Sequence, residues 1–219
     1  MNNQKTDRRF FIGLDLGQAR DPSAITVLER STMTDLGLRE GASMMHPVVV
    51  TEALVHLERP LLLTPYPDVV ARVRAICEAA PLAGYCTLVV DATGVGRPVL
   101  DMLRVALKDS KTPILPVMIT SGERETQANG MWHVPKRDLV SALAIRIQKR
   151  AIAIADGLPH IEALLKELMN FRMKMSLSGH DSYEAWRAGQ HDDLVIALAL
   201  ACWAAKRKTA GLQGPLLSH

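Results

Sequence analysis

The sequence predicts a single α/β domain built on a mixed sheet, and three observations support this prediction. Short apolar runs, many of them β-branched, alternate with segments of helical spacing along most of the chain. The first three runs, at 9–17, 23–30 and 46–59, follow one another without a helix between them, which is typical of an antiparallel meander. No internal repeat, low-complexity segment or linker divides the 219 residues, a length that can bury a substantial core.

Helices and strands alternate after the meander. Helices are predicted at 66–80, 96–107, 135–150 and 158–171, strands at 86–94 and 114–120, a half-exposed strand at 172–179, and a last helix at 192–208. The strand at 172–179 rests on the alternation of basic or polar residues with apolar ones. We therefore expect one domain over 10–208, between a flexible N-terminal lead at 1–9 and a flexible tail at 209–219.

Composition indicates a soluble cytoplasmic protein. The formal net charge is only +3, too small by itself to indicate a nucleic-acid binder. Cys77, Cys86 and Cys202 show neither CxxC nor zinc-site spacing, so we interpret them as reduced core residues. No apolar stretch follows the polar N-terminus, so no signal peptide is expected. The uncharged run at 194–205 is well short of the ~20 residues that span a bilayer.

Acidic residues stand where two predicted strands end and where the last helix begins. Asp15 ends the first strand, Asp91 lies near the end of the strand at 86–94, and Asp192 and Asp193 open the helix. If those two strands pair, their carboxylates share one edge of the sheet, and the helix can bring the acidic pair to the same place. Converging carboxylates repel unless cations hold them, and oxygen ligands suit Mg²⁺ or Mn²⁺. One Asp of the pair would then cap the helix while the other binds metal.

Three segments in this order resemble the nuclease domain of phage terminase large subunits, a ribonuclease H-like domain related to Holliday-junction resolvases. They are "GLDLG" at the end of the first strand, "VVDATGVGRPVLDML" and "HDDLVIALALA"; "VPKRDLVSAL" and "KELMNFRM" are also similar. The resemblance covers residues 10 to 205. It implies an α/β, ribonuclease H-like mixed β-sheet, with a three-stranded antiparallel meander plus parallel strands, flanked by helices.

The resemblance also implies a function and a site. The family's metal ligands fall on Asp15, Asp91 and the pair Asp192–Asp193, with Asp193 the favoured ligand of the pair, so Asp15, Asp91 and Asp193 are the expected catalytic residues. Two Mg²⁺ or Mn²⁺ ions ~3.5–4 Å apart activate water and stabilise the leaving oxygen in phosphodiester hydrolysis. The implied protein is a metal-dependent endonuclease that cuts duplex, concatemeric DNA during genome packaging in the bacterial host cytoplasm.

Basic side chains are candidates for contacts with DNA phosphates. Lys136 and Arg137 open the helix at 135–150, and Arg172 and Lys174 share one face of the strand predicted at 172–179. Such contacts would make binding depend on salt. Solvated helix or strand faces are the alternative for all four residues.

Two departures from the family pattern bear on function. Relatives often carry another acid three residues after the pair, on the same helix face, and Ile196 stands there in this chain. The phosphate loop GxxxxGK[ST] of a packaging motor is absent. The sequence therefore resembles the nuclease part alone, whose implied partners are a separate terminase ATPase, the small terminase subunit and the capsid portal.

Other interpretations of the same residues stay open. Asp15 and Asp91 could simply end strands, the acidic pair could act only in capping, and Asp21, Asp181 and His191 fit turns or a helix start. A non-catalytic module that binds DNA or docks on a portal would keep the fold without the chemistry. "GLDLG" also begins sugar kinases and actin-like ATPases, but those need two such domains.

Overall fold

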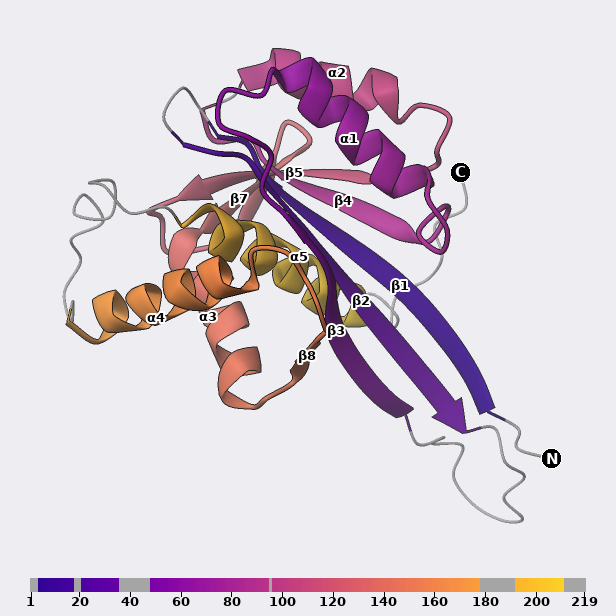
Figure 1. Cartoon of the computed structure of the whole chain (residues 1–219), viewed down its shortest axis with the longest axis vertical. Coiled ribbons are helices and arrows are strands. Elements are labelled where there is room, and N and C mark those ends of the chain that lie inside the picture. The colour runs from indigo at the N-terminus through magenta and orange to yellow at the C-terminus, as the bar shows by residue number, and fades with distance from the viewer. Residues whose placement is uncertain (1–3, 18–20, 36–47, 95, 178–191, 211–219) are drawn as a thin grey trace.

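A computed structural model describes residues 4–17, 21–35, 48–94, 96–177 and 192–210 (Figure 1). The strands are β1 (Gln4–Asp15), β2 (Ala24–Asp35), β3 (Val48–Glu58), β4 (Cys86–Asp91), β5 (Ile114–Thr120), β6 (Thr126–Ala128), β7 (Met131–Pro135) and β8 (Ile152–Ile154). The helices are α1 (Tyr66–Glu78), α2 (Gly96–Ala106), α3 (Lys136–Gln148), α4 (Ile161–Leu177) and α5 (Asp193–Ala210).

The strands form one mixed sheet in the order β6-β7-β5-β4-β1-β2-β3-β8. β1, β2 and β3 pair antiparallel, so the predicted meander is confirmed. β1, β4, β5 and β7 then pair in parallel, which places the C-terminal ends of β1 and β4 at one edge. β1 begins at Gln4 rather than at the predicted Arg9, because residues 4–9 pair with the second half of β2.

Helices cover both faces of the sheet, in agreement with the predicted fold class. Side chains alternate along β1, so Phe10, Ile12 and Leu14 pack under α1 and α2 while Phe11 packs under α5. Figure 1 shows α1 and α2 on one side of the strands and α3, α4 and α5 on the other. Each face has its own buried apolar cluster.

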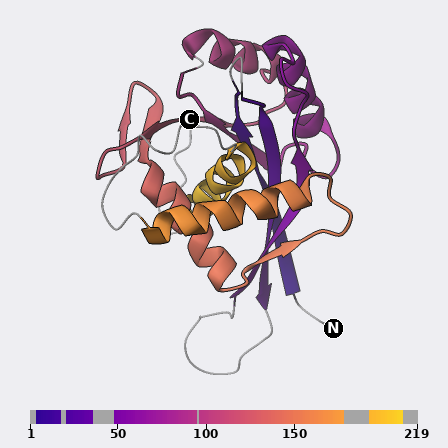
Figure 2. The ribbon, with the colours of Figure 1, turned by 60° about the vertical axis from the view of Figure 1, so that its left-hand side comes forward.

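The helix α5 lies inside the molecule. Every residue from Leu194 to Ala205 is buried, because α5 packs on β1 and β2 and is covered by α3 and α4 (Figure 2). None of the described helices is long and apolar enough to cross a membrane. Gly13 permits the close approach to β1: a Cβ at this position would lie 1.8 Å from the carbonyl oxygen of Ala197. The first glycine of "GLDLG" thus has a packing role.

Two local predictions differ from the structure. The strand predicted at 172–179 is wrong, since α4 continues as helix through Leu177. Leu164 and Leu168 lie one turn apart on α4 and pack against the core, so packing sets a helical period here. The alternation at 172–177 is too short to tell a strand from the continuation of this helix. The hairpin of β6 and β7 was not predicted. Asn129 and Gly130 between its strands both have positive φ, as a two-residue primed turn requires.

Candidate metal centre

Asp15 and Asp91 lie side by side at the edge of the sheet. The parallel register pairs Leu14 with Val90, and each Asp is the next residue of its strand. The backbone N–H of Thr93 donates to Asp91 Oδ1 at 2.8 Å, which holds this carboxylate in the turn after β4. The sequence argument assumed that these two strands pair; they do so in parallel, and the two acids therefore end neighbouring strands at one edge.

The start of α5 brings the other two acids to the same edge. Burial raises the pKa of Asp15 well above its usual range, and the negative charges of Asp91, Asp193 and Asp192 raise it further. Asp193 itself is only 6 % exposed. The four predicted acids therefore interact electrostatically at one place, in a setting that favours a cation.

Lys136 supplies a cation to this acidic cluster. As the first residue of α3 it directs its ammonium nitrogen to Asp192 Oδ2 at 3.0 Å. Its positive charge opposes the rise in the pKa of Asp15. The pKa of Asp91 is likewise raised, by burial and by Asp192, against the lowering effects of Thr93 and Lys136. Lys136 was predicted as a DNA contact, and the structure places it against the acids themselves.

A second cation reaches the cluster from the end of β3. Arg59 Nη2 lies 3.6 Å from Asp193 Oδ2 and also donates to Glu167 Oε1, a buried carboxylate on α4. Glu167 Oε2 in turn accepts from the backbone N–H groups of Leu194 and Val195, at 3.1 and 3.3 Å. Burial raises the pKa of Glu167, while Arg59 and the two amides lower it.

The prediction that an Asp of the pair caps α5 is therefore corrected. Asp192 stands at the position before the helix, but its carboxylate accepts from Lys136, and Glu167 accepts from the first amides. Sequence reasoning missed Arg59 and Glu167. The available signal was the position of Glu167, three residues after Leu164 and therefore on the core-facing side of an amphipathic helix.

The carboxylate oxygens of the cluster are the type of ligand that divalent metal ions prefer, although two of the acids contact basic side chains. No group of three or more acidic, histidine or cysteine side chains is arranged to hold a metal ion in the part of the chain that the structure describes. Within the cluster, Lys136 contacts Asp192 and Arg59 contacts Asp193. The four carboxylates at this sheet edge nonetheless offer only oxygen donors, the kind of ligand that suits Mg²⁺ or Mn²⁺.

The remaining predicted residues lie apart from this cluster. Arg137 is half-exposed and donates to the carbonyl oxygen of Glu123 at 2.5 Å. Arg172 and Lys174 belong to α4, but their side chains lie outside the described residues, as does His191. Ile196, on α5, is buried in the core cluster, so this position serves packing here.

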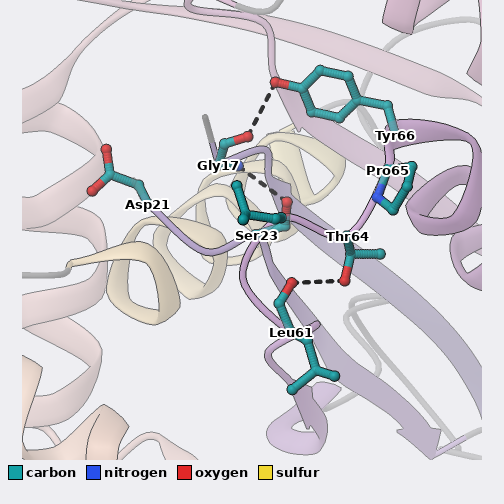
Figure 3. A pocket seen from close by; sticks show the side chains of 8 residues that line it. Gly17, Asp21, Ser23, Leu61, Thr64, Pro65 and Tyr66 are labelled. Carbon is teal, nitrogen blue, oxygen red and sulfur yellow. Dashed lines mark hydrogen bonds between the residues drawn. The ribbon is translucent and has the colours of Figure 1, made fainter. Parts of the chain in front are cut away.

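A hollow of about 190 Å³ adjoins the end of β1 (Figure 3). Its wall includes Gly17, Ser23, Tyr66 and also Asp21, which was predicted as a turn residue. The N–H of Gly17 donates to Ser23 Oγ, and the hydroxyl of Tyr66 donates to the carbonyl oxygen of Gly17, both at 3.1 Å. The backbone two residues beyond Asp15 is thus fixed from two sides.

Comparisons with known proteins identify what this arrangement is similar to. No protein-family model matches the chain. Over 201 residues, 92 % of its length, the chain is 31 % identical to a terminase large subunit of Thermus virus P23-45 and 30 % identical to that of Thermus phage G20c. The match spans about a third (33 %) of each relative's length.

A solved structure shows the same fold. It is the K428A mutant nuclease domain of the large terminase subunit gp2 of bacterial virus Sf6, with manganese and β-thujaplicinol. The TM-score is 0.57 and the identity 13 %, and the match covers 89 % of this chain and 87 % of that one. The predicted ribonuclease H-like fold is confirmed. Together, these comparisons confirm the resemblance of this chain to the nuclease domain of phage terminase large subunits.

Proposed function

We propose that the protein is a metal-dependent endonuclease that hydrolyses duplex DNA. The observation that carries this proposal is the convergence of Asp15, Asp91 and the pair Asp192–Asp193 at one edge of a sheet with the fold of a terminase nuclease domain. Proteins tolerate such a concentration of negative charge where cations compensate it. The Sf6 relative, whose structure contains manganese, supports a divalent ion in that role.

Each acid has a defined part in this proposal. Asp15 and Asp91 would hold the first ion between the ends of β1 and β4, and Asp193 would complete the site beside Asp192. Two such ions, when bound, supply an activated water and stabilise the leaving oxygen. Glu167 and Arg59 keep the start of α5 and the Asp193 carboxylate in position. The backbone N–H of Thr93 holds the Asp91 carboxylate by a hydrogen bond.

Basic side chains would bind the DNA backbone. Lys136 adjoins the acids, and half-exposed Arg137 follows it on α3, so both could contact phosphates next to the bond that is cut. Arg172 and Lys174 remain predicted contacts. Cleavage of concatemeric DNA during packaging in the host cytoplasm, together with an ATPase, a small subunit and a portal, is the part of the proposal that rests on the family resemblance; the relatives themselves are named terminase large subunits.

Cleavage of supercoiled plasmid tests the function directly. Purified protein is expected to nick and linearise plasmid with Mn²⁺ or Mg²⁺ but not with EDTA. The Asp91→Asn variant should lose this activity, while Asp101→Asn, an exposed Asp on α2, should retain it. Equal cutting by Asp91→Asn and wild type in the same metal would show that the site is assigned wrongly.

A non-catalytic DNA-binding or portal-docking module is the second candidate. The observation in its favour is Ile196, which lies in the core where relatives often place a further acid. The two candidates differ in metal binding. A folded protein that binds duplex DNA but shows no Mn²⁺ binding by electron paramagnetic resonance would support the module and contradict the nuclease.

A further inference from the structure

The turn between β3 and α1 exposes three consecutive leucines. Leu61, Leu62 and Leu63 are 86 %, 51 % and 73 % exposed, although neighbouring apolar side chains are mostly buried. Leu63 has φ 67°, a left-handed conformation that is an outlier for a bulky side chain. Pro60 precedes the leucines and Pro65 closes the turn. We call residues 60–65 the leucine turn.

The leucine turn is braced internally and has a fixed shape. The hydroxyl of Thr64 donates to the carbonyl oxygen of Leu61 at 2.6 Å, and the Thr64 N–H donates to the same oxygen at 3.0 Å (Figure 3). Prolines at both ends restrict the backbone further. Unusual backbone conformations persist where the surroundings fix them, and they concentrate at functional sites. The turn therefore presents its leucines in one orientation.

One end of the leucine turn contacts the acidic cluster, and the other contacts the backbone close to it. Arg59, immediately before it, lies 3.6 Å from Asp193 Oδ2. Tyr66, immediately after it, donates to the carbonyl oxygen of Gly17, two residues beyond Asp15. Because β3 runs parallel to β1, the turn leaves the sheet at the edge where Asp15 stands. Since Arg59 adjoins both Pro60 and Asp193, a duplex bound at these acids would also meet the leucine turn.

We propose that the leucine turn is an apolar wedge that contacts the minor groove of the bound duplex and unstacks a base step near the phosphate to be cut. Proteins that bend DNA insert leucine and similar side chains between base steps in this way. The inference rests on the proposed nuclease function and adds to it a contact that deforms the substrate. Duplex DNA is the occupant because the proposed function brings it to the acids beside the turn.

The test removes the wedge without disturbing the fold. In the triple variant Leu61→Ser, Leu62→Ser, Leu63→Asn, asparagine replaces the left-handed leucine because it tolerates that backbone. Val105→Ser, a change at a 77 % exposed residue on α2, is the matched control. Each change is placed in an Asp91→Asn background, in which DNA is bound without being cut. The probe is a duplex in which 2-aminopurine replaces several adenines. The fluorescence of 2-aminopurine rises when the base unstacks, and several labelled positions report this wherever along the duplex the protein binds.

The expected results separate the wedge from its alternatives. Fluorescence should rise when the Asp91→Asn parent or the Val105→Ser control binds the probe, and should stay near the free-DNA level with the triple variant. The triple variant should also bind roughly tenfold more weakly, as the loss of buried leucine surface predicts. Equal fluorescence and affinity in parent and triple variant would overturn the wedge, whether or not a protein partner binds the leucines. Failure of the nuclease function would appear separately, as uncut plasmid with wild-type protein.

Discussion

The carboxylate of Glu167 accepts a hydrogen bond from the backbone N–H of Leu194, across the contact between α4 and α5. The same carboxylate binds Arg59, which in turn lies beside Asp193. The buried Glu167 side chain therefore accepts hydrogen bonds from the first amides of α5 and also holds Arg59 next to Asp193, a proposed metal ligand. Capping by a residue of another helix makes the acid cluster depend on the position of α4.

Replacement of Glu167 tests this dependence. Glu167→Ala leaves the first amides of α5 and the Arg59 guanidinium without their acceptor, and should lower the free energy of unfolding by about 1–3 kcal/mol. Glu167→Gln keeps an amide oxygen as acceptor and should lose less stability. Urea unfolding of the metal-free protein measures both variants. If Ala and Gln cost the same, the hydrogen bonds to the helix start would not be the source of the effect.

Gly13 should tolerate no side chain. Its missing Cβ faces the carbonyl oxygen of Ala197 at 1.8 Å, so Gly13→Ala must push α5 away from β1. Overpacking of this kind costs about 1–3 kcal/mol, and the displaced helix should also weaken Mn²⁺ binding through Asp193. Gly122→Ala is the control, because its nearest neighbour is a Thr120 hydroxyl at 3.4 Å. Thermal unfolding and a Mn²⁺ titration that showed equal behaviour for both variants would refute the close-packing argument.

Removal of one carboxylate from the cluster should stabilise the metal-free protein. Asp15 is half-buried and experiences the negative charges of three other acids, so Asp15→Asn relieves repulsion. We expect a higher unfolding temperature than wild type in EDTA, together with loss of plasmid cleavage. Asp109→Asn, at an exposed turn, should change neither property. A lower unfolding temperature for Asp15→Asn would mean that its carboxylate holds the fold together rather than the substrate.

Divalent metal should stabilise the folded protein through the same acids. Binding to the native state alone contributes about 2.7 kcal/mol when the free metal is at 100 times its dissociation constant. The unfolding temperature should therefore rise with Mn²⁺ in wild type and in Asp101→Asn, and much less in Asp193→Asn. A rise of equal size in all three proteins would place the metal elsewhere.

The outline of the fold was predictable because the local sequence patterns favour the same strands and helices that the long-range contacts stabilise. The apolar runs that form β4 and the second half of β1 are buried on both faces, so their composition alone indicates strands. Asp15 and Asp91 could be placed together because parallel neighbours end at one edge. The turn at Asn129–Gly130 carried a recognisable hairpin signal that was overlooked.

Other features depend on contacts that no local pattern contains. Residues 172–177 alternate like a strand but continue α4, since the helix begins earlier and is held by packing at Leu164. Arg59 and Glu167 are 108 positions apart, and their meeting requires the end of β3 and the middle of α4 to be placed first. The role of Glu167 as the cap of α5 follows from tertiary structure alone.

The burial of α5 has a consequence for how the chain folds as it is synthesised. Gly13 of β1 contacts Ala197 of α5, so the two partners of this contact are synthesised far apart in time. At the usual rate of about 5–20 residues per second, the delay between them is about ten seconds or more. Until then the face of the sheet that includes Phe11, Leu28 and Leu54 has no cover. A nascent chain in this state would be a natural client for chaperones that hold exposed apolar strands, and the acid cluster would be assembled last.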